Sequence, residues 1–282
     1  MEPLALALSL AAVRAAPPPP LPAGVPVEPA KAAVLELLRG TEVPASYIES
    51  VFADPRTAVD PDVADRFNNP KPGTGEAMPW PDYRRLVVSP ARIAAGRAFL
   101  GAHRAEVDAA ASAYGVDPGV LAAIAGIETF YGARTGTYSV FNALYTVVNR
   151  VPRRASWGAR ELAALVRIAY DDRSDAHAVL GSWAGAYGYV QFMPSSLLTW
   201  GVDFDGDGRR DLYDWPDALA SAANYLSRAG WPADTRDLSY HSKAWWAVYA
   251  YNHSDDYARA VILLGQTLDG RAPSPSAFPS AR

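Results

Sequence analysis

The chain has 282 residues, of which half are hydrophobic and a fifth are charged, so it has enough apolar side chains for a sizeable folded core. Its net charge of −4 gives no reason to expect a nucleic-acid partner, because such proteins usually carry a basic surface. It has no cysteine, which excludes disulfides, thiolate nucleophiles and cysteine-ligated zinc. A lipoprotein anchor is attached to a cysteine, so we expect no lipid anchor.

Residues 1–27 have the pattern of an export leader followed by a linker. Leu4–Val13 is an apolar segment of signal-peptide length, and Val13-Arg14-Ala15 offers small residues for cleavage, although Glu2 is the only charged side chain before it. The four prolines at 17–20 begin a stiff, extended linker. We therefore expect a soluble protein of the periplasm or cell envelope. The alternative is a disordered alanine-rich tail.

Helical patterns dominate the first half of the remaining chain. One helix is expected from Pro29 to the residue before Gly40, and residues 57–82, rich in Pro, Gly, Asn and Asp, predict a long irregular connection. Ser89-Pro90 begins a helix that should continue to about residue 115. Asp117-Pro118 begins another that should reach Tyr131, because the aspartate caps free backbone N–H groups and proline fits the first turn.

In the second half, helices are expected over 159–170, 216–228 and 255–264, the last two ended by Gly230 and Gly265. Residues 183–192 are glycine-rich and aromatic without helical periodicity, which predicts a loop or short strands. The sequence thus predicts an α+β domain, mainly α, over 28–268, and a flexible tail over 269–282.

Glu128 lies on the apolar side of the helix that begins at Asp117. It follows Ile124 by four residues and Leu121 by seven, so it should project from the buried stripe. Burial of an unpaired carboxyl group raises its pKa, because the charged form loses its hydration. A protonated glutamic acid in an apolar wall is suited to act as a general acid. The helix alone leaves another interpretation open, in which Glu128 stands at the edge of the stripe or pairs with an arginine.

Four motifs follow one another along the chain. They are Gly126-Ile-Glu-Thr-Phe-Tyr-Gly132, Tyr138-Ser139 through Pro152-Arg-Arg154, the glycine-rich block from Gly181 to Ser196, and Tyr251-Asn-His-Ser254. Together they resemble the B-type family of membrane-bound lytic murein transglycosylases, in order and at similar spacing from about residue 30 to 268. The resemblance implies a lysozyme-like fold with accessory N-terminal helices.

The resemblance also implies roles for individual residues. Glu128 matches the single catalytic acid of the family. The matched substrate-binding residues are Ser182, Gln191, Tyr225, Tyr251, Asn252 and Tyr257, with Arg153 and Arg154 as a basic pair that contacts the strand or its peptide stems. Trp183, Tyr187 and Tyr189 add aromatic faces of the kind that bind polymeric sugars, whereas Trp245 and Trp246 are expected in the core. For the arginine pair, a solvated turn is an equal alternative.

Residues 203–214 have the oxygen spacing of an EF-hand-like calcium loop. Asp203, Asp205 and Asp207 stand at positions 1, 3 and 5, Gly208 makes the sharp turn, and Arg209 offers its carbonyl at position 7. Asp214 occupies position 12, where the pattern expects Glu. The resemblance favours a longer loop closed by Asp217, with Asp211 and Asp214 as secondary candidates, and a structural calcium. The alternative is an Asp/Gly surface turn.

The resemblance implies that the protein is a peptidoglycan lytic transglycosylase, a lyase that cleaves the β-1,4 bond between N-acetylmuramic acid and N-acetylglucosamine and leaves 1,6-anhydromuramic acid ends. We expect a monomer that uses peptidoglycan strands in cell-wall turnover and no organic cofactor. Two alternatives remain open: a hydrolytic muramidase with a second carboxylate, and a non-catalytic glycan-binding module.

Overall fold

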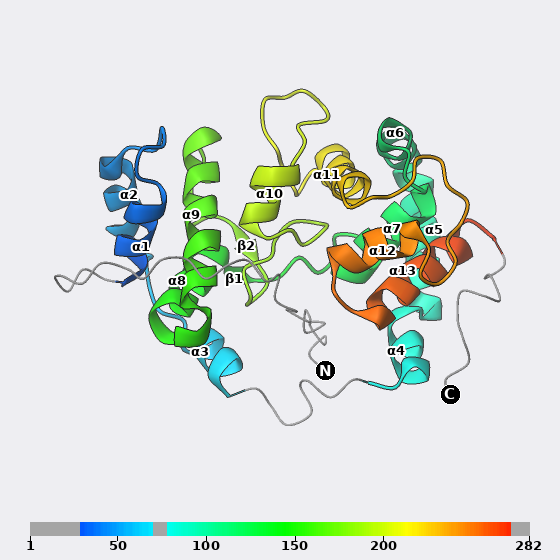
Figure 1. Cartoon of the computed structure of the whole chain (residues 1–282), viewed down its shortest axis with the longest axis horizontal. Helices are drawn as coiled ribbons and strands as arrows, with labels where there is room; N and C mark the ends of the chain where they lie inside the picture. The colour runs from blue at the N-terminus through cyan, green and yellow to red at the C-terminus, as the bar shows by residue number, and fades with distance from the viewer. Residues whose placement is uncertain (1–28, 70–77, 272–282) are drawn as a thin grey trace.

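The computed structural model describes residues 29–69 and 78–271. The expected leader, the 17–20 linker and most of the expected tail lie outside these residues. In the described parts, helices form two groups on either side of a small sheet (Figure 1). The strands β1 (Tyr138–Ser139) and β2 (Leu180–Gly181) pair antiparallel, with Tyr138 opposite Gly181.

The helices fall into two groups, and one short helix contacts both of them. The first group comprises α1 (Pro29–Leu37), α2 (Ala45–Phe52), α3 (Pro61–Asn68), α8 (Val140–Arg150) and α9 (Ala155–Asp171). The second comprises α4 (Trp80–Val87), α5 (Pro90–Ala102), α6 (Arg104–Tyr114), α7 (Pro118–Thr129), α11 (Trp215–Arg228), α12 (Lys243–Tyr251) and α13 (Asp255–Leu268). Between them, α10 (Pro194–Trp200) contacts both α9 and α11 (Figure 1). The expected mainly helical α+β architecture is confirmed.

Helix α7 is the most completely buried helix of the second group. Its start is as predicted, because the Asp117 side chain accepts a hydrogen bond from the Val120 N–H at 3.1 Å. Its end differs by two residues: the helix stops at Thr129, since Phe130 and Tyr131 both have a positive φ. The Thr129 hydroxyl then donates to the Tyr189 carbonyl at 2.8 Å and ties the helix end to the glycine-rich block.

Helices α7 and α13 cross at two glycines. A Cβ on Gly265 would lie 2.9 Å from the Gly119 carbonyl carbon, and one on Gly119 would lie 2.6 Å from the Gly265 oxygen. The prediction that Gly265 ends its helix is therefore wrong, because α13 continues to Leu268. The glycine allows the close approach of two backbones rather than the end of one helix.

The irregular connection predicted over 57–82 contains two helix segments instead. The Asp60 side chain caps α3 by accepting from the N–H groups of Asp62 and Val63, and Phe67 is buried one turn after Val63. Asp and Pro, which indicated a loop, here begin a helix. In the second described part of the chain, α4 begins at Trp80 and ends at Val87.

Other boundaries also depend on packing. The helix predicted from Ser89-Pro90 to about residue 115 is broken at His103, which separates α5 from α6. Helices α2, α8, α10 and α12 were not predicted. Trp245 is buried as expected, but the prediction that Trp246 is a core residue is wrong, because 49% of it is exposed on α12.

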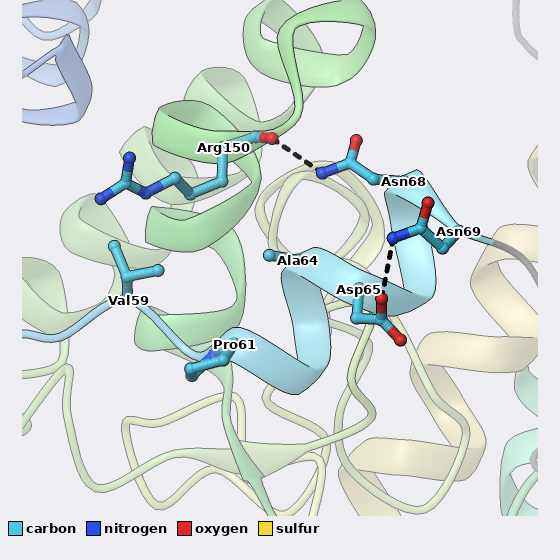
Figure 2. A pocket seen from close by; sticks show the side chains of 7 residues that line it. All are labelled: Val59, Pro61, Ala64, Asp65, Asn68, Asn69 and Arg150. Carbon is cyan, nitrogen blue, oxygen red and sulfur yellow. Dashed lines mark hydrogen bonds between the residues drawn. The ribbon is translucent and has the colours of Figure 1, made fainter.

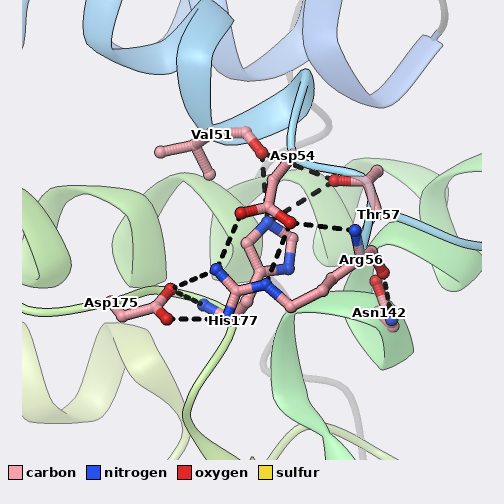
Figure 3. Close-up of polar contacts among 7 residues, drawn as sticks. All are labelled: Val51, Asp54, Arg56, Thr57, Asn142, Asp175 and His177. Atoms are coloured by element: carbon pink, nitrogen blue, oxygen red, sulfur yellow. Dashed lines mark hydrogen bonds and ion pairs between the residues drawn. The ribbon is translucent and has the colours of Figure 1, made fainter.

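A polar cluster joins the end of α2 to the segment between α9 and β2 (Figure 3). The Arg56 guanidinium contacts Asp54 and Asp175, each at 2.7 Å, and its hydrogen bonds hold the pKa of Asp54 below the usual range. The His177 Nε2 lies 3.0 Å from the Val51 carbonyl oxygen. This cluster fixes α2 against the rest of the first group.

Along the described parts of the chain, no single helix has both the length and the apolar character needed to cross a membrane. Helices α6 and α7 meet those criteria only as a pair, with a bend of 118° between them.

Candidate functional site

Glu128 is the next-to-last residue of α7 and is partly exposed, at the end of a helix that is buried on nearly all sides. The predicted apolar stripe was too narrow, since Ala122, Ala125 and Gly126 are buried as well. The whole helix is a core element, and its last turn places one carboxyl group at the surface of that core.

The carboxyl of Glu128 accepts a hydrogen bond from the Tyr257 hydroxyl, with 2.6 Å between Oε1 and the phenol oxygen. Burial raises the pKa of Glu128 from 4.5 to about 7, and the Tyr257 hydrogen bond opposes part of that rise. No other carboxylate of residues 29–69 and 78–271 contributes to this pKa. The shift therefore arises from desolvation and not from a pair of carboxylates that share a proton.

The three tyrosines predicted for the site contact one another, and one of them contacts Glu128. The rings of Tyr251 and Tyr257 are parallel, with centroids 6.4 Å apart, and the Tyr225 ring meets Tyr251 edge-on at 5.0 Å. The Tyr251 hydroxyl donates to the Val190 carbonyl at 2.6 Å, and Tyr225 donates to the Ala250 carbonyl at 2.7 Å. These bonds hold the rings in place beside the acid.

Asn252 lies at the C-terminal end of α12, next to Tyr251, and is buried. Its side-chain Oδ1 has no hydrogen-bond partner within the part of the chain that the structure describes. A buried amide oxygen without a partner costs free energy, so it marks a place where a hydrogen-bond donor is missing.

Tyr83 is a residue of this site that the sequence analysis missed. It projects from α4, and the charge of Glu128 is the second cause, after burial, of its raised pKa. Helix α4 packs against α13, the helix that carries Tyr257. The local signal was Trp80-Pro81, a helix start, which the proline- and glycine-rich sequence before it obscured.

The glycine-rich block lies against the ends of α7 and α12 through the carbonyls of Tyr189 and Val190. Gln191 has a φ of 50°, and its Nε2 donates to the Gly188 and Thr135 carbonyls at 3.0 and 3.1 Å. The Ser182 hydroxyl accepts from the Ala186 N–H at 3.1 Å. Both side chains thus hold the loop in shape, and their contact with a substrate stays a prediction.

Arg153 and Arg154 lie in the first helical group, whereas Glu128 lies in the second. They lie in a short 3₁₀ turn after α8, where Arg153 donates to the Phe67 carbonyl and the Arg154 guanidinium lies 6.0 Å from the Trp157 ring. A surface pocket opens nearby, between α3 and the end of α8 (Figure 2). Its lining residues are Val59, Pro61, Ala64, Asp65, Asn68, Asn69 and Arg150, none of which was a predicted site residue.

The acidic loop before α11 gathers three carboxylates. Oxygen atoms of Asp203, Asp205 and Asp217 all lie within 4.8 Å of one another. Asp203 accepts from the N–H groups of Gly206 and Gly208, at 2.9 and 3.0 Å, so the loop curls around its first carboxylate. Such a set of hard oxygen ligands fits Ca²⁺.

Asp217 closes this cluster from the first turn of α11. It is 1% exposed and accepts from the N–H groups of Phe204 and Asp211 at 2.7 and 2.8 Å, which fixes both ends of the loop to the helix. Asp207 lies outside the three-carboxylate cluster and accepts instead from the Arg209 N–H at 2.8 Å. Asp211 and Asp214 also lie outside the cluster.

Comparisons with known proteins identify the family and the fold of the chain. Residues 27–242 match the family model described as the transglycosylase SLT domain. The membrane-bound lytic murein transglycosylase B of Escherichia coli (strain K12) is 38% identical over 161 residues, which are 57% of this chain and 45% of that protein. The aligned part thus spans less than half of that relative's length.

Several solved structures share the fold, and two of them bear on the site. The E. coli lytic transglycosylase Slt35 in complex with calcium has a TM-score of 0.75 and 25% identity, over 85% of this chain and 92% of that chain. The structure of SltB3 from Pseudomonas aeruginosa in complex with NAG-anhNAM-pentapeptide has a TM-score of 0.76 and 26% identity, over 88% and 81%. The fold is thus the mostly helical, lysozyme-like fold of these proteins. With its family model matched over most of its length, the chain belongs to the transglycosylase SLT-domain family.

Proposed function

We propose that the protein is a peptidoglycan lytic transglycosylase that uses Glu128 as its only acid. The observation that carries this proposal is a single desolvated carboxyl, with a pKa raised to about 7 and a tyrosine hydroxyl at 2.6 Å. The family, its murein-cleaving relative and the SltB3 complex with an anhydro-muropeptide support peptidoglycan as the substrate.

The proposed reaction uses one carboxyl group twice, first as an acid and then as a base. Protonated Glu128 gives its proton to the glycosidic oxygen as the bond to C1 of N-acetylmuramic acid breaks. The substrate's 2-acetamido oxygen bonds to C1 and stabilises the positive charge there. Ionised Glu128, which the Tyr257 hydroxyl stabilises, then takes the proton from the C6 hydroxyl as that oxygen displaces the acetamido group. The product is a 1,6-anhydro ring, and the acid returns protonated.

A hydrolytic muramidase is less well supported, because it needs a second carboxylate to hold a water or to act as nucleophile. Glu161 is a buried glutamate in the described part of the chain, but it accepts two bonds from Ser195, at 3.0 Å from the N–H and 2.8 Å from the hydroxyl. It thereby caps α10 and has a structural role. A purely glycan-binding module would not need a neutral acid.

The roles of the surrounding residues belong to the same proposal. Tyr225, Tyr251 and Asn252 would orient the sugar beside Glu128, and the missing donor at Asn252 Oδ1 suits a substrate hydroxyl or amide. Ser182 and Gln191 would act through the loop they hold, and Arg153 and Arg154 would contact a more distant part of the strand. Helices α1–α3 would be an accessory region of one catalytic domain.

We also infer that the acidic loop binds a structural calcium ion through Asp203, Asp205 and Asp217. The three-carboxylate cluster and the calcium complex of Slt35 support this inference. Calcium would neutralise repulsion among these carboxylates and fix the loop to α11, which carries Tyr225. Asp207 and the Arg209 carbonyl are its further candidate ligands. The protein would act in the periplasm or cell envelope, as a soluble monomer.

The proposed reaction is tested by mass spectrometry of the products from purified peptidoglycan. A lytic transglycosylase releases muropeptides with anhydro ends, which are one water lighter than reducing ends. The parent protein should give anhydro products, and Glu128→Gln should reduce their rate by about 100- to 10,000-fold, as expected when a general acid–base is removed. Reducing ends from the parent would indicate hydrolysis and contradict the proposal.

A further inference from the structure

The short helix α10 is held at its two ends by side chains from the two helical groups. It has 7 residues, too few for a helix to be stable on its own, so its contacts decide its position. At its start, the Glu161 carboxylate on α9 accepts from the N–H and the hydroxyl of Ser195, at 3.0 and 2.8 Å. At its end, Asn224 on α11 donates to the Trp200 carbonyl at 2.9 Å. Helix α10 thus links α9 to α11 through polar contacts at its ends (Figure 1).

Glu161 supplies a cap to α10 that the residue before the helix does not. Met193 stands at the N-cap position and makes no side-chain hydrogen bond to the helix. Glu161 is 5% exposed, and burial raises its pKa, a rise that the two bonds from Ser195 oppose more than the charge of Arg160 does. A buried carboxylate that loses its donors costs free energy, so Glu161 and Ser195 stay together. Helix α9 thereby fixes the start of α10.

Both ends of α10 contact tyrosines of the candidate site. Phe192, three residues before Ser195, is buried, and its ring centroid is 6.0 Å from that of Tyr225 and 5.8 Å from that of Tyr251. Trp200, the last residue of α10, meets Tyr225 edge-on at 5.9 Å. Because side chains in a core are closely packed, a shift of α10 would displace the rings that hold Tyr225 and Tyr251 in place.

Tyr251 connects this packing to the acid. Its ring is parallel to that of Tyr257, whose hydroxyl donates to Glu128. Burial and then the charge of Glu128 raise the pKa values of Tyr83, Tyr251 and Tyr257, so all three lie close to the acid. Burial in turn raises the pKa of Glu128 to about 7. If the rings around it loosened, water would reach the carboxyl and its pKa would fall.

We propose that Glu161 is a positioning residue for the proposed reaction: by holding Ser195 at the start of α10, it keeps Tyr225 and Tyr251 packed beside Glu128. Glu161 itself contacts neither the substrate nor the reacting atoms. The inference rests on the proposed function, because the packing matters for the reaction only if Glu128 is the acid. It assigns to a residue of the first helical group a role in supporting an acid of the second.

The test measures the pKa of Glu128 directly, by NMR titration of carbon-13-labelled glutamate side chains, with Glu128→Gln to identify the signal. In Glu161→Gln the amide cannot accept both bonds from Ser195, so the pKa of Glu128 should fall from about 7 toward 4.5. Ser195→Ala removes one of the two bonds and should give a smaller fall. Ser195→Thr keeps both donors and should give the parent value. If Glu161→Gln does not fold, the two Ser195 variants carry the same test.

A second measurement follows the release of anhydro products from purified peptidoglycan over the same pH range. Glu161→Gln should act about 10- to 100-fold more slowly at pH 5, because a small displacement of orienting groups is costly, and its rate should fall at a lower pH than that of the parent. Val63→Ala is the control. Val63 is fully buried on α3, which packs against α8, so this variant should lose stability but keep the parent's pKa of Glu128 and pH profile.

An unchanged pKa of Glu128 in Glu161→Gln, or an equally large shift in Val63→Ala, would overturn the proposal. The positioning role and the proposed reaction can fail separately. If the parent protein releases no anhydro products but the pKa of Glu128 falls in Glu161→Gln, the positioning role stands and the reaction is wrong. If anhydro products form and Glu161→Gln keeps the parent's pKa and pH profile, only the positioning role is wrong.

Discussion

Replacing Glu128 by glutamine should stabilise the protein, and the gain should depend on pH. The folded-state pKa of Glu128, about 7, lies above its ordinary value of 4.5, so folding favours the protonated form. The parent protein therefore has its full stability below about pH 4.5 and loses stability as the pH rises through 7. Glutamine resembles the protonated acid in shape and remains neutral throughout, so the variant avoids this loss.

The size of the effect follows from the two pKa values. Their difference corresponds to roughly 3 kcal/mol once the carboxyl is fully ionised, because each pKa unit is equivalent to about 1.4 kcal/mol. Glu128 is partly exposed, so solvent screening reduces the measured value. We expect the free energy of unfolding of Glu128→Gln to rise relative to the parent by about 1 to 3 kcal/mol between pH 4 and pH 8.

The assay is denaturant unfolding of both proteins at several pH values between 4 and 8.5. Glu161→Gln is the matched control: burial also raises the pKa of Glu161, but this carboxylate accepts two bonds from Ser195 that an amide cannot both accept. That variant should lose stability across the whole range. The rate of anhydro-product formation by the parent should fall above about pH 7, as Glu128 ionises.

A difference between Glu128→Gln and the parent that does not change with pH would refute this reasoning. It would mean that the carboxyl is as well solvated in the folded protein as in the unfolded chain. The acid would then be ionised at neutral pH, and the first proton transfer proposed for it would lack its proton.

Three further predictions concern the surroundings of this acid. Tyr257→Phe removes the hydrogen-bond donor to the carboxylate of Glu128 and should raise the pKa of that group, so the alkaline limit of activity should move to higher pH. In urea unfolding at pH 8.5, the free energy of unfolding should fall by about 1 to 3 kcal/mol. Gly265→Ala should lower the free energy of unfolding by about 1 to 3 kcal/mol, because its Cβ meets the Gly119 backbone. The control Gly101→Ala has open space around its Cβ and should be neutral or slightly stabilising. Equal melting temperatures of the two variants would contradict the close crossing. Chelation of calcium should lower the melting temperature and added calcium should restore it, and an unchanged melting curve would refute the site at the acidic loop.

The sequence predicted best those features that depend on neighbouring residues. Asp117-Pro118 begins α7 as its capping pattern indicates, and the 183–192 block lacks helix as its glycines indicate. The tyrosines placed near Glu128 by the family resemblance do lie together, and Asp217 does close the acidic cluster. The first two predictions came from local patterns of residue types, and the last two came from the family resemblance.

Features that depend on tertiary packing were not predictable in this way. Gly265 has the local signature of a helix end, yet it lies inside α13 because another backbone approaches it there. Trp246 has the composition of a core residue, and only the position of α12 at the surface exposes it. Tyr83 approaches Glu128 because α4 packs on α13, a contact between segments far apart in the chain.

The glycine crossing also has a consequence for the chemistry. Glu128 is nine residues after Gly119 on α7, and Tyr257 is eight residues before Gly265 on α13, so each lies about 12 to 14 Å from the crossing along its own helix. Because both groups are at similar distances from one point of contact, the angle between the helices sets the separation of the Tyr257 hydroxyl and the Glu128 carboxyl. Two helices forced apart at the crossing would lengthen a 2.6 Å hydrogen bond that the ionised acid needs. The absence of side chains at Gly119 and Gly265 therefore supports the proton-transfer site as well as the core.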